Sequence, residues 1–343
     1  MRTLTRQELN RALLARQLLL ERGRLDLPEA LERIGGIQAQ YAPSMYIGLW
    51  SRLAGFERAD LTRALEERSV VQATLMRGTI HLVSRADFWP FALATRAVRR
   101  TLFLRSRRGD PSAAAMAGAA RTVRRHLADG AELRRSEIDA LVGKDRAAGV
   151  GHWVDLVRAP PSGTWERRRA DRFALAEDWI GPPELGAAAA AVHLVRRYLA
   201  GFGPASRKDI ASFTGFGLGP LDALLAGLEL RRFATAEGEE LLDLPDLPLP
   251  AADTPAPPRF LPTWDANLLT HARRTGVLPE EHRAKLFATK VPQSFPSFLV
   301  DGAVAGTWRH ADGEIELAPF GPLAPRDEAA LRDEAARLAA FHT

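Results

Sequence analysis

The chain has 343 residues, of which 46% are hydrophobic and 26% charged, and its net charge of +5 is carried almost entirely by arginine. This composition is ordinary for a globular protein, and the absence of cysteine excludes disulfides, thiolate catalysis, iron–sulfur clusters and cysteine-bound zinc. No apolar run approaches the roughly 20 residues that span a bilayer, and the N-terminus lacks a signal core, so we expect a cytoplasmic protein.

Three segments of the chain resemble one another. Residues 123–143 (VRRHLADGAELRRSEIDALVG) align without gaps to residues 195–215 (VRRYLAGFGPASRKDIASFTG), and residues 15–35 (ARQLLLERGRLDLPEALERIG) fit more loosely. Each pattern predicts an amphipathic helix, a short turn and a second helix that ends at glycine.

The sequence after each repeat is also similar. The first repeat is followed by helical patterns over 43–53 and 57–68, and then by a hairpin over 70–84 that turns at Arg77-Gly78. The second is followed by a helix-like stretch over 144–159 and a hairpin pattern over 160–179.

The third repeat is followed by a helix from residue 218 and a hairpin over 230–244. Helix, helix, helix and hairpin is the order of a winged helix-turn-helix. We therefore predict three such modules in tandem, and the alternative is three unrelated helical segments.

A proline-rich break over 244–259 separates a C-terminal region with hairpin turns at Asp301-Gly302 and Asp312-Gly313 and a closing helix. The predicted fold is mainly α with β-hairpins (α+β): three tandem winged helix-turn-helix modules and a small α+β domain. We expect boundaries of 1–110, 111–186, 187–247 and 248–343.

Several kinds of chemistry have no motif here. The eight histidines are scattered without ligand spacing, so we expect no metal. There is no phosphate-binding loop, nucleophile elbow or dinucleotide fingerprint, so we expect no cofactor.

Gln38 and Gln40 follow two glycines in a stretch that contains no acid, nucleophile or metal ligand. In an extended segment their side chains face the same way, and two amides offer donors and acceptors to one water and one polar substrate edge. The alternative is that both glutamines only satisfy the backbone of the turn.

Arginines gather in two places. No acid lies between Asp87 and Asp110, a stretch that holds Arg96, Arg99, Arg100, Arg105, Arg107 and Arg108. The second cluster holds Arg167, Arg168, Arg169 and Arg172. A GC-rich genome favours arginine without any functional reason, whereas the clustering favours a nucleic-acid partner.

Two residues of the first hairpin are further candidates for DNA binding. Arg77 lies at the turn, where a winged helix commonly meets phosphate. His81 lies in an alternating strand, where a half-buried structural role is the alternative. We expect Phe88 and Trp89 to belong to the core.

Four motifs together resemble the AlkZ/YcaQ family of bacterial DNA glycosylases over about residues 5–335: GIQAQYAPSMYIGLWSRL, RGTIHLV, FGPASRKDIASFTG and VDGAVAGTWR. The family's architecture of three winged helices agrees with the repeats. Its catalytic Gln-Φ-Gln motif, with Φ apolar, corresponds here to Gln38-Ala39-Gln40, in the AlkZ-like branch. Alanine is small for Φ.

The resemblance implies hydrolysis of the N-glycosidic bond of N7-alkylpurines, and in some members the unhooking of interstrand crosslinks or self-resistance to genotoxins. An N7-alkylguanine already carries a positive charge and leaves without acid catalysis, so positioned amides can suffice. No lysine precedes Lys144, which argues against a Schiff-base lyase step in the first module.

We therefore expect a monofunctional enzyme that acts, as a monomer, on double-stranded DNA with alkylated bases in the bacterial cytoplasm and nucleoid. The arginine clusters predict an open basic channel around the duplex. Two alternatives stay open: a non-catalytic winged-helix DNA-binding regulator, and a resistance protein that sequesters a genotoxin.

Overall fold

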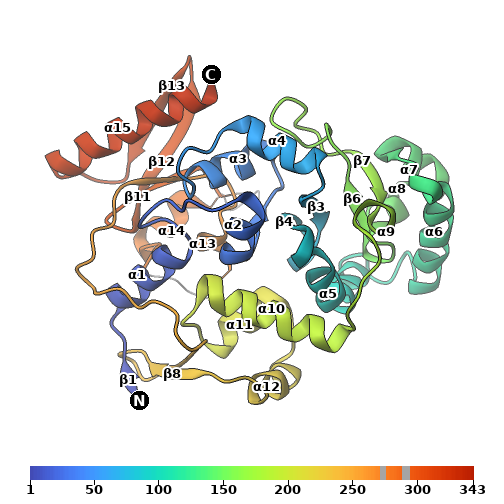
Figure 1. The fold of residues 1–343 in the computed structure, drawn as a ribbon, viewed down its shortest axis with the longest axis horizontal. Helices are drawn as coiled ribbons and strands as arrows, with labels where there is room; N and C mark the ends of the chain where they lie inside the picture. The colour runs from blue at the N-terminus through green and yellow to red at the C-terminus, as the bar shows by residue number, and fades with distance from the viewer. Residues whose placement is uncertain (271–275, 288–293) are drawn as a thin grey trace.

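The computed structural model describes residues 1–270, 276–287 and 294–343. It is 48% helical and 17% strand, which confirms the predicted α+β class. Figure 1 shows the second module at one end of the molecule and the C-terminal domain at the other, with the first module between them. The third module lies along one side.

The first winged-helix module contains the catalytic candidates. Its second helix begins after Asp26, whose side chain accepts a hydrogen bond from the Glu29 amide, and ends at Gly35 with φ +77°. The elements of this module are α1 (Arg6–Arg16), α2 (Leu27–Ile34), α3 (Ala42–Trp50), α4 (Arg58–Glu66) and the wing strands β3 (Val70–Thr74) and β4 (Ile80–Ser84).

The second and third modules also place helices before a two-stranded wing, but with three helices where the first module has four. Their second helices end at Gly143 (φ +81°) and Gly215 (φ +77°), as the repeat predicts. The second comprises α6 (Ala113–His126), β5 (Leu133–Arg134), α7 (Arg135–Val142), α8 (Lys144–Ala147), β6 (Leu156–Arg158), β7 (Arg172–Leu175) and α9 (Ala176–Ile180). The third comprises α10 (Ala187–Phe202), α11 (Arg207–Thr214), α12 (Leu218–Ala226), β8 (Arg231–Ala234) and β9 (Glu240–Asp243).

The predicted helix over 144–159 is wrong in its second half. The chain forms the four-residue α8, a 3₁₀ turn η3 (Val150–His152) and then the first wing strand, β6. Gly149 and Gly151 both disfavour a continued helix. The wing of this module is consequently a long loop between β6 and β7, and it carries the second arginine cluster.

The wings of the first two modules form one sheet, with the strand order β2-β4-β3-β6-β7-β5. The short β2 (Ile37–Gln38) pairs with β4 at one edge, and the two wings meet where Ala73 of β3 pairs with Val157 of β6. At the N-terminus, β1 (Arg2–Thr3) pairs in parallel with β8 of the third module. The modules therefore share sheets as well as core.

The C-terminal domain is a four-stranded antiparallel sheet with helices. Both predicted Asp-Gly turns are present, with positive φ at Asp301 (46°), Gly302 (80°), Asp312 (50°) and Gly313 (84°), as type I′ turns require. The predicted closing helix, α15, packs on the sheet through Leu331 and other buried residues. The elements are β10 (Arg259–Leu261), α13 (Ala266–Leu269), α14 (Glu280–Leu286), β11 (Ser297–Val300), β12 (Ala303–Ala311), β13 (Glu314–Pro319) and α15 (Pro325–His342).

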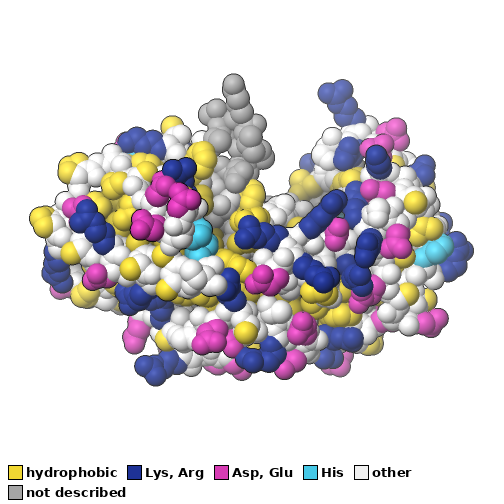
Figure 2. Space-filling model, turned by 90° about the horizontal axis from the view of Figure 1, so that it is seen from above, with side chains coloured by type: hydrophobic (Ala, Val, Ile, Leu, Met, Phe, Trp, Pro, Cys, Tyr) yellow, Lys and Arg dark blue, Asp and Glu magenta, His cyan; other side chains and the backbone are white. Residues whose placement is uncertain are grey.

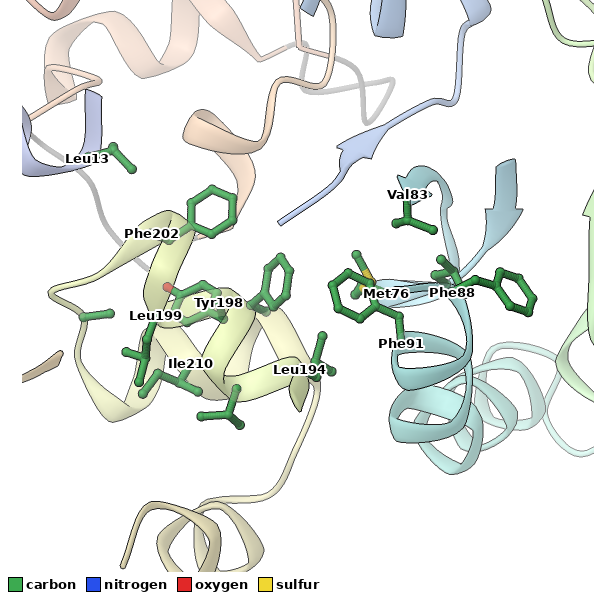
Figure 3. Close-up of a cluster of buried hydrophobic side chains, with 14 of the residues drawn as sticks. Leu13, Met76, Val83, Phe88, Phe91, Leu194, Tyr198, Leu199, Phe202 and Ile210 are labelled. Atoms are coloured by element: carbon green, nitrogen blue, oxygen red, sulfur yellow. The ribbon is translucent and has the colours of Figure 1, made fainter. Parts of the chain in front are cut away.

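One hydrophobic cluster joins the modules through α5 (Arg85–Ser106), a 22-residue helix that follows the first wing. Phe88 and Trp89, predicted to be core, are 1% and 7% exposed. Figure 3 shows the side chains of wing 1 and α5 on one side of this core and those of α10 and α11 on the other. The first wing is thus supported by packing against α10 and α11 of the third module.

A buried ion pair ties the first module to the third. Both guanidinium nitrogens of Arg16 at the end of α1 donate to the Asp243 carboxylate of β9, at 2.7 and 2.9 Å, and neither side chain is more than 2% exposed. Arg231 donates to the same carboxylate at 2.6 Å. Among the described residues, no helix is long and apolar enough to cross a membrane.

Candidate active site

The strand that carries Gln38 is formed by a tight turn after α2. Gly35 and Gly36 have φ of +77° and +80°, and a Cβ added at Gly36 would lie 3.1 Å from the Leu82 carbonyl oxygen of β4. The second glycine therefore lets β2 lie directly against the first wing. There Gln38 pairs with His81, and the Ala39 amide donates to the Ile80 carbonyl at 2.7 Å.

Gln38 is held by the tip of the first wing. Its side chain is 6% exposed, and its Oε1 accepts a hydrogen bond from Arg77 Nη2 at 3.1 Å. Because a guanidinium has only donors, the oxygen end of the amide must be the end that faces Arg77. The Gln38 Nε2 group, a double donor, therefore faces away from Arg77.

Gln40 is held by the same wing through a different group. Its Oε1 accepts the Ile80 backbone N–H at 2.7 Å, and its side chain is exposed. The amide oxygen thus takes the position that a backbone carbonyl would occupy if the β2–β4 ladder continued. Both glutamines consequently have their oxygens bound to wing donors and their Nε2 donors directed elsewhere.

Arg77 adopts a strained conformation to reach Gln38. Its φ is 54°, in the left-handed region that a non-glycine residue seldom adopts, and Gly78 follows at 72°. The guanidinium lies 5.6 Å from the Phe213 ring centre, and burial lowers the Arg77 pKa to about 10. Its Nη1 is buried without an acceptor among the described protein groups. Such a donor favours binding an anion or a water.

His81 is enclosed beside this pair. It is 3% exposed, its Nδ1 lies 3.1 Å from the Thr79 carbonyl oxygen, and burial, assisted by the charge of Arg77, lowers its pKa to about 3. The imidazole is therefore neutral at pH 7. It lies beside Gln38 and Arg77, and because it is neutral it carries no positive charge that would attract a phosphate.

The neutral His81 has a consequence for stability. An unfolded histidine takes up a proton below about pH 6.5, whereas folded His81 does so only near pH 3, so acidification through this window favours the unfolded state. From this residue alone we expect unfolding to become easier by about 2 kcal/mol between pH 7 and pH 5.

Urea unfolding at both pH values tests this expectation. His81→Gln should lose less stability on acidification than the wild type, while His126→Gln, a substitution at an exposed histidine, should follow the wild type. Equal losses in all three proteins would contradict a neutral buried His81.

Gln40 lines a pocket of about 230 Å³ between the first wing and the second module. Thr74 and Gly78 form the wall on the side of the first wing, and Arg135, Arg158 and His152 form the wall opposite. No carboxylate lines the pocket among the described residues. Arg158 donates to Thr74 Oγ1 at 3.4 Å, and burial lowers its pKa to about 10. Arg135 pairs with Asp139 at 2.7 Å, so Arg158 supplies the positive charge of the pocket.

The first arginine cluster connects α5 to the second module. Arg99 is 2% exposed and donates to the carbonyl oxygens of Thr74, Gly151 and Ala92 at 2.9 to 3.2 Å. Arg96 pairs with Asp155 at 2.6 Å, and Arg100 donates to the His152 carbonyl at 2.9 Å. Arg99 thus braces the pocket from inside, while Arg96 and Arg100 remain partly exposed.

The second cluster lies on the wing of the second module, where Arg167, Arg168 and Arg169 are exposed and Arg172 is half-buried and paired with Glu132. Arg168 donates to the Tyr41 hydroxyl at 3.0 Å, which brings it beside the residue that follows Gln40. Arg169 is 86% exposed and pairs with Asp171 at 3.2 Å. The structure therefore joins this cluster to the glutamine motif.

The AlkZ-like DNA glycosylase family model matches residues 31–341. The chain belongs to this family. As an AlkZ-like DNA glycosylase it acts on DNA. It is similar to the solved structure of the DNA glycosylase AlkZ from Streptomyces sahachiroi, at 22% identity and a TM-score of 0.80, over 99% of this chain and 97% of the other. No curated protein sequence matches.

Sequence reasoning on this AlkZ-like glycosylase missed several pocket residues. Arg135 could have been found, because it lies in the second repeat beside the predicted turn. Arg158 and His152 lacked any signal, since they fell in the stretch expected to be helical. Among the described residues, no group of three or more His, Asp or Glu side chains could hold a metal.

Proposed function

We propose that this AlkZ-like protein is a monofunctional DNA glycosylase that hydrolyses the N-glycosidic bond of cationic N7-alkylguanine adducts. One observation carries the proposal: two glutamine amides, each fixed by a donor of the first wing, lie at or beside an arginine-lined pocket that no carboxylate lines among the described residues. The similarity to AlkZ, a DNA glycosylase, supports the glycosylase part of the proposal.

The absence of an acid in this site matches a substrate that needs none. In N7-alkylguanine the ring is already positive, so the C1′–N9 bond can break with its electron pair moving onto the base, which becomes neutral. Water then forms the new bond to C1′ and releases its proton to solvent. A neutral base would leave with a negative charge and would require a general acid.

The amide orientations assign a role to each end of the glutamines. The Gln40 oxygen keeps a second lone pair, which accepts a hydrogen of the attacking water. The Nε2 groups donate to acceptor atoms of the leaving base, whose electron density rises as the bond breaks. The bond from Arg77 to Gln38 Oε1 polarises that amide and strengthens its N–H donors.

DNA is held, in this proposal, by the exposed arginines of the second wing. Arg167, Arg168 and Arg169 contact phosphates, whereas Arg77, whose guanidinium is buried at the tip of the first wing, supports Gln38. Arg96 and Arg100 add charge at the margin. The buried His81 and Arg99 have structural roles: His81 pairs with Gln38 between β4 and β2, and Arg99 bonds backbone carbonyls at the pocket.

The setting and breadth of the activity are also proposals. The enzyme acts as a monomer on the DNA of the bacterial cytoplasm and nucleoid, since one chain carries all three modules. The Gln40 side chain is exposed, which makes the motif accessible to bulky adducts, including interstrand crosslinks. An enzyme that accepts such a range of adducts would serve in base excision repair or in resistance to a genotoxin.

Release of the modified base is the direct test. We expect the purified protein to liberate 7-methylguanine from duplex DNA and to open a nitrogen-mustard crosslink, without strand cleavage by a lyase step. DNA that carries a neutral lesion, such as uracil or hypoxanthine, serves as the matched substrate and should stay intact. Sequence-specific binding with no release from any cationic lesion would instead favour the regulator.

A further inference from the structure

A second pocket, of about 270 Å³, lies on the other side of the glutamine motif. It is lined by Tyr41 of the first module, by Trp165 and Arg168 of the second wing, and by Trp308 and His342 of the C-terminal domain. Elements from three parts of the chain meet here. Figure 2 views the molecule from above, with the C-terminal domain at the left and the second module at the right.

Backbone geometry separates this pocket from the one that Gln40 lines. Tyr41 has φ −127° and ψ 121°, so the chain is extended where it leaves the motif. Successive side chains of an extended chain point to opposite sides. Gln40 accordingly lines the pocket beside the second module, and Tyr41 lines the pocket toward the C-terminal domain. The two pockets lie one residue apart along the motif.

The walls of the second pocket are aromatic. Trp165 and Trp308 are each 6% exposed, and they hold rings at its base. Tyr41 is 42% exposed, which is high for an aromatic ring, and its hydroxyl is fixed by Arg168. An exposed aromatic ring beside other rings is an arrangement on which unpaired bases stack.

The pocket also offers polar groups without negative charge. Arg168 and Arg309 are exposed at its margin, Arg309 is paired with Glu316, and no carboxylate lines the pocket among the described residues. His342 stacks on His310 at 4.2 Å between ring centres, and its Nε2 is buried with no partner among the described groups. Burial, together with nearby positive charges, lowers the His342 pKa to about 4. A neutral imidazole can hydrogen-bond the edge of a base.

We propose that this pocket binds the base of one unpaired nucleotide next to, or opposite, the damaged one, with the attached phosphate on Arg168. The pocket is too small for a typical drug-sized ligand, whose sites start near 300 Å³, but a single base is a smaller group. This proposal rests on the proposed function in one respect: it assumes that the damaged nucleotide lies at Gln38 and Gln40. It adds a second nucleotide, held on the Tyr41 side of the motif.

A binding experiment that combines protein variants with altered DNA duplexes tests the pocket and requires no catalysis. Binding is measured to a duplex that carries no alkylated base but has a stable abasic analogue where the damaged nucleotide would lie. Tyr41→Ala should weaken binding about 5- to 150-fold, the loss of one base stack. The measurement is repeated on three duplexes in which the 5′ neighbour, the 3′ neighbour or the opposite base is also removed. On one of them Tyr41→Ala should have no effect.

Three further variants complete the test. Arg168→Ala should weaken binding to the starting duplex, and by a smaller factor on the duplex where Tyr41→Ala has no effect, because Arg168 holds both the Tyr41 hydroxyl and the phosphate of the bound nucleotide. Tyr41→Phe should keep the base-dependent part, and Leu102→Ala, at an exposed apolar residue of α5, should bind normally. A Tyr41→Ala effect that is absent, or equal on all duplexes, would overturn the pocket. Base release that survives changes at Gln38 and Gln40 would affect only the assignment of the catalytic residues.

Discussion

Replacing Gln38 or Gln40 by alanine is expected to slow the release of 7-methylguanine about 10²- to 10³-fold, the typical loss for one fixed donor at a reacting centre. Each change removes an amide whose oxygen is anchored to the wing, by Arg77 or by the Ile80 N–H. Single-turnover rates on duplex DNA measure the effect. We expect the double variant to lose little more than the worse single variant if both amides act on the same transition state.

Glutamate at each position separates the two functions of the amide. Gln38→Glu and Gln40→Glu keep an oxygen for Arg77 and for Ile80 but remove the Nε2 donors. If those donors stabilise the leaving base, both variants should be nearly as slow as the alanine variants. If only the oxygen matters, by orienting water, the glutamate variants should keep most of the activity.

Binding controls make these results interpretable. Each variant should hold duplex DNA with an abasic analogue as tightly as the wild type does, within about threefold, since phosphate contacts dominate affinity. Full activity in both alanine variants would remove Gln38 and Gln40 from the mechanism while leaving the family assignment in place.

Replacing Asp243 by alanine is expected to destabilise the folded protein by about 3–5 kcal/mol. The change leaves the guanidinium of Arg16 buried without its counter-ion. It also removes the ionic partner of Arg231. Desolvated charge of this kind is far more costly than the loss of a surface pair. Chemical unfolding, or the shift in Tm, measures the loss.

The same hairpin supplies a matched control. Arg232 and Glu240 pair at 2.6 Å between β8 and β9, but their side chains are 59% and 42% exposed. Glu240→Ala should therefore cost less than about 1 kcal/mol. Similar losses for the two variants would show that the bond between Arg16 and Asp243 is not the brace between α1 and the third module that its burial suggests.

Local rules explain what the sequence could predict. Glycine at the end of each repeat and Asp-Gly between apolar runs each require a positive φ, and Gly35, Gly215, Gly302 and Gly313 all have one. Such constraints depend on a few neighbouring residues. The repeats, the two Asp-Gly turns and the glutamine turn could therefore be located without knowledge of the packing.

Long-range packing decided what the sequence could not predict. The arginines of α5 were expected on a DNA-facing surface because no acid is near them in sequence, yet Asp155 of the second module approaches Arg96 to 2.6 Å. The pairing of Ala73 with Val157 across two modules has no local signature either. The candidate site was thus half predicted: its motif was found, whereas its opposite wall, with Arg158, was not.

The sheet that joins the first two wings limits how this protein can be divided. A fragment ending near residue 110 would lose β6, which pairs with β3, and would expose one side of a strand made of apolar residues such as Val71 and Ala73. Unpaired strand edges are templates for aggregation. Chimaeras between related glycosylases should therefore exchange the first two modules as one unit, with crossovers placed after residue 180, where the shared sheet has ended.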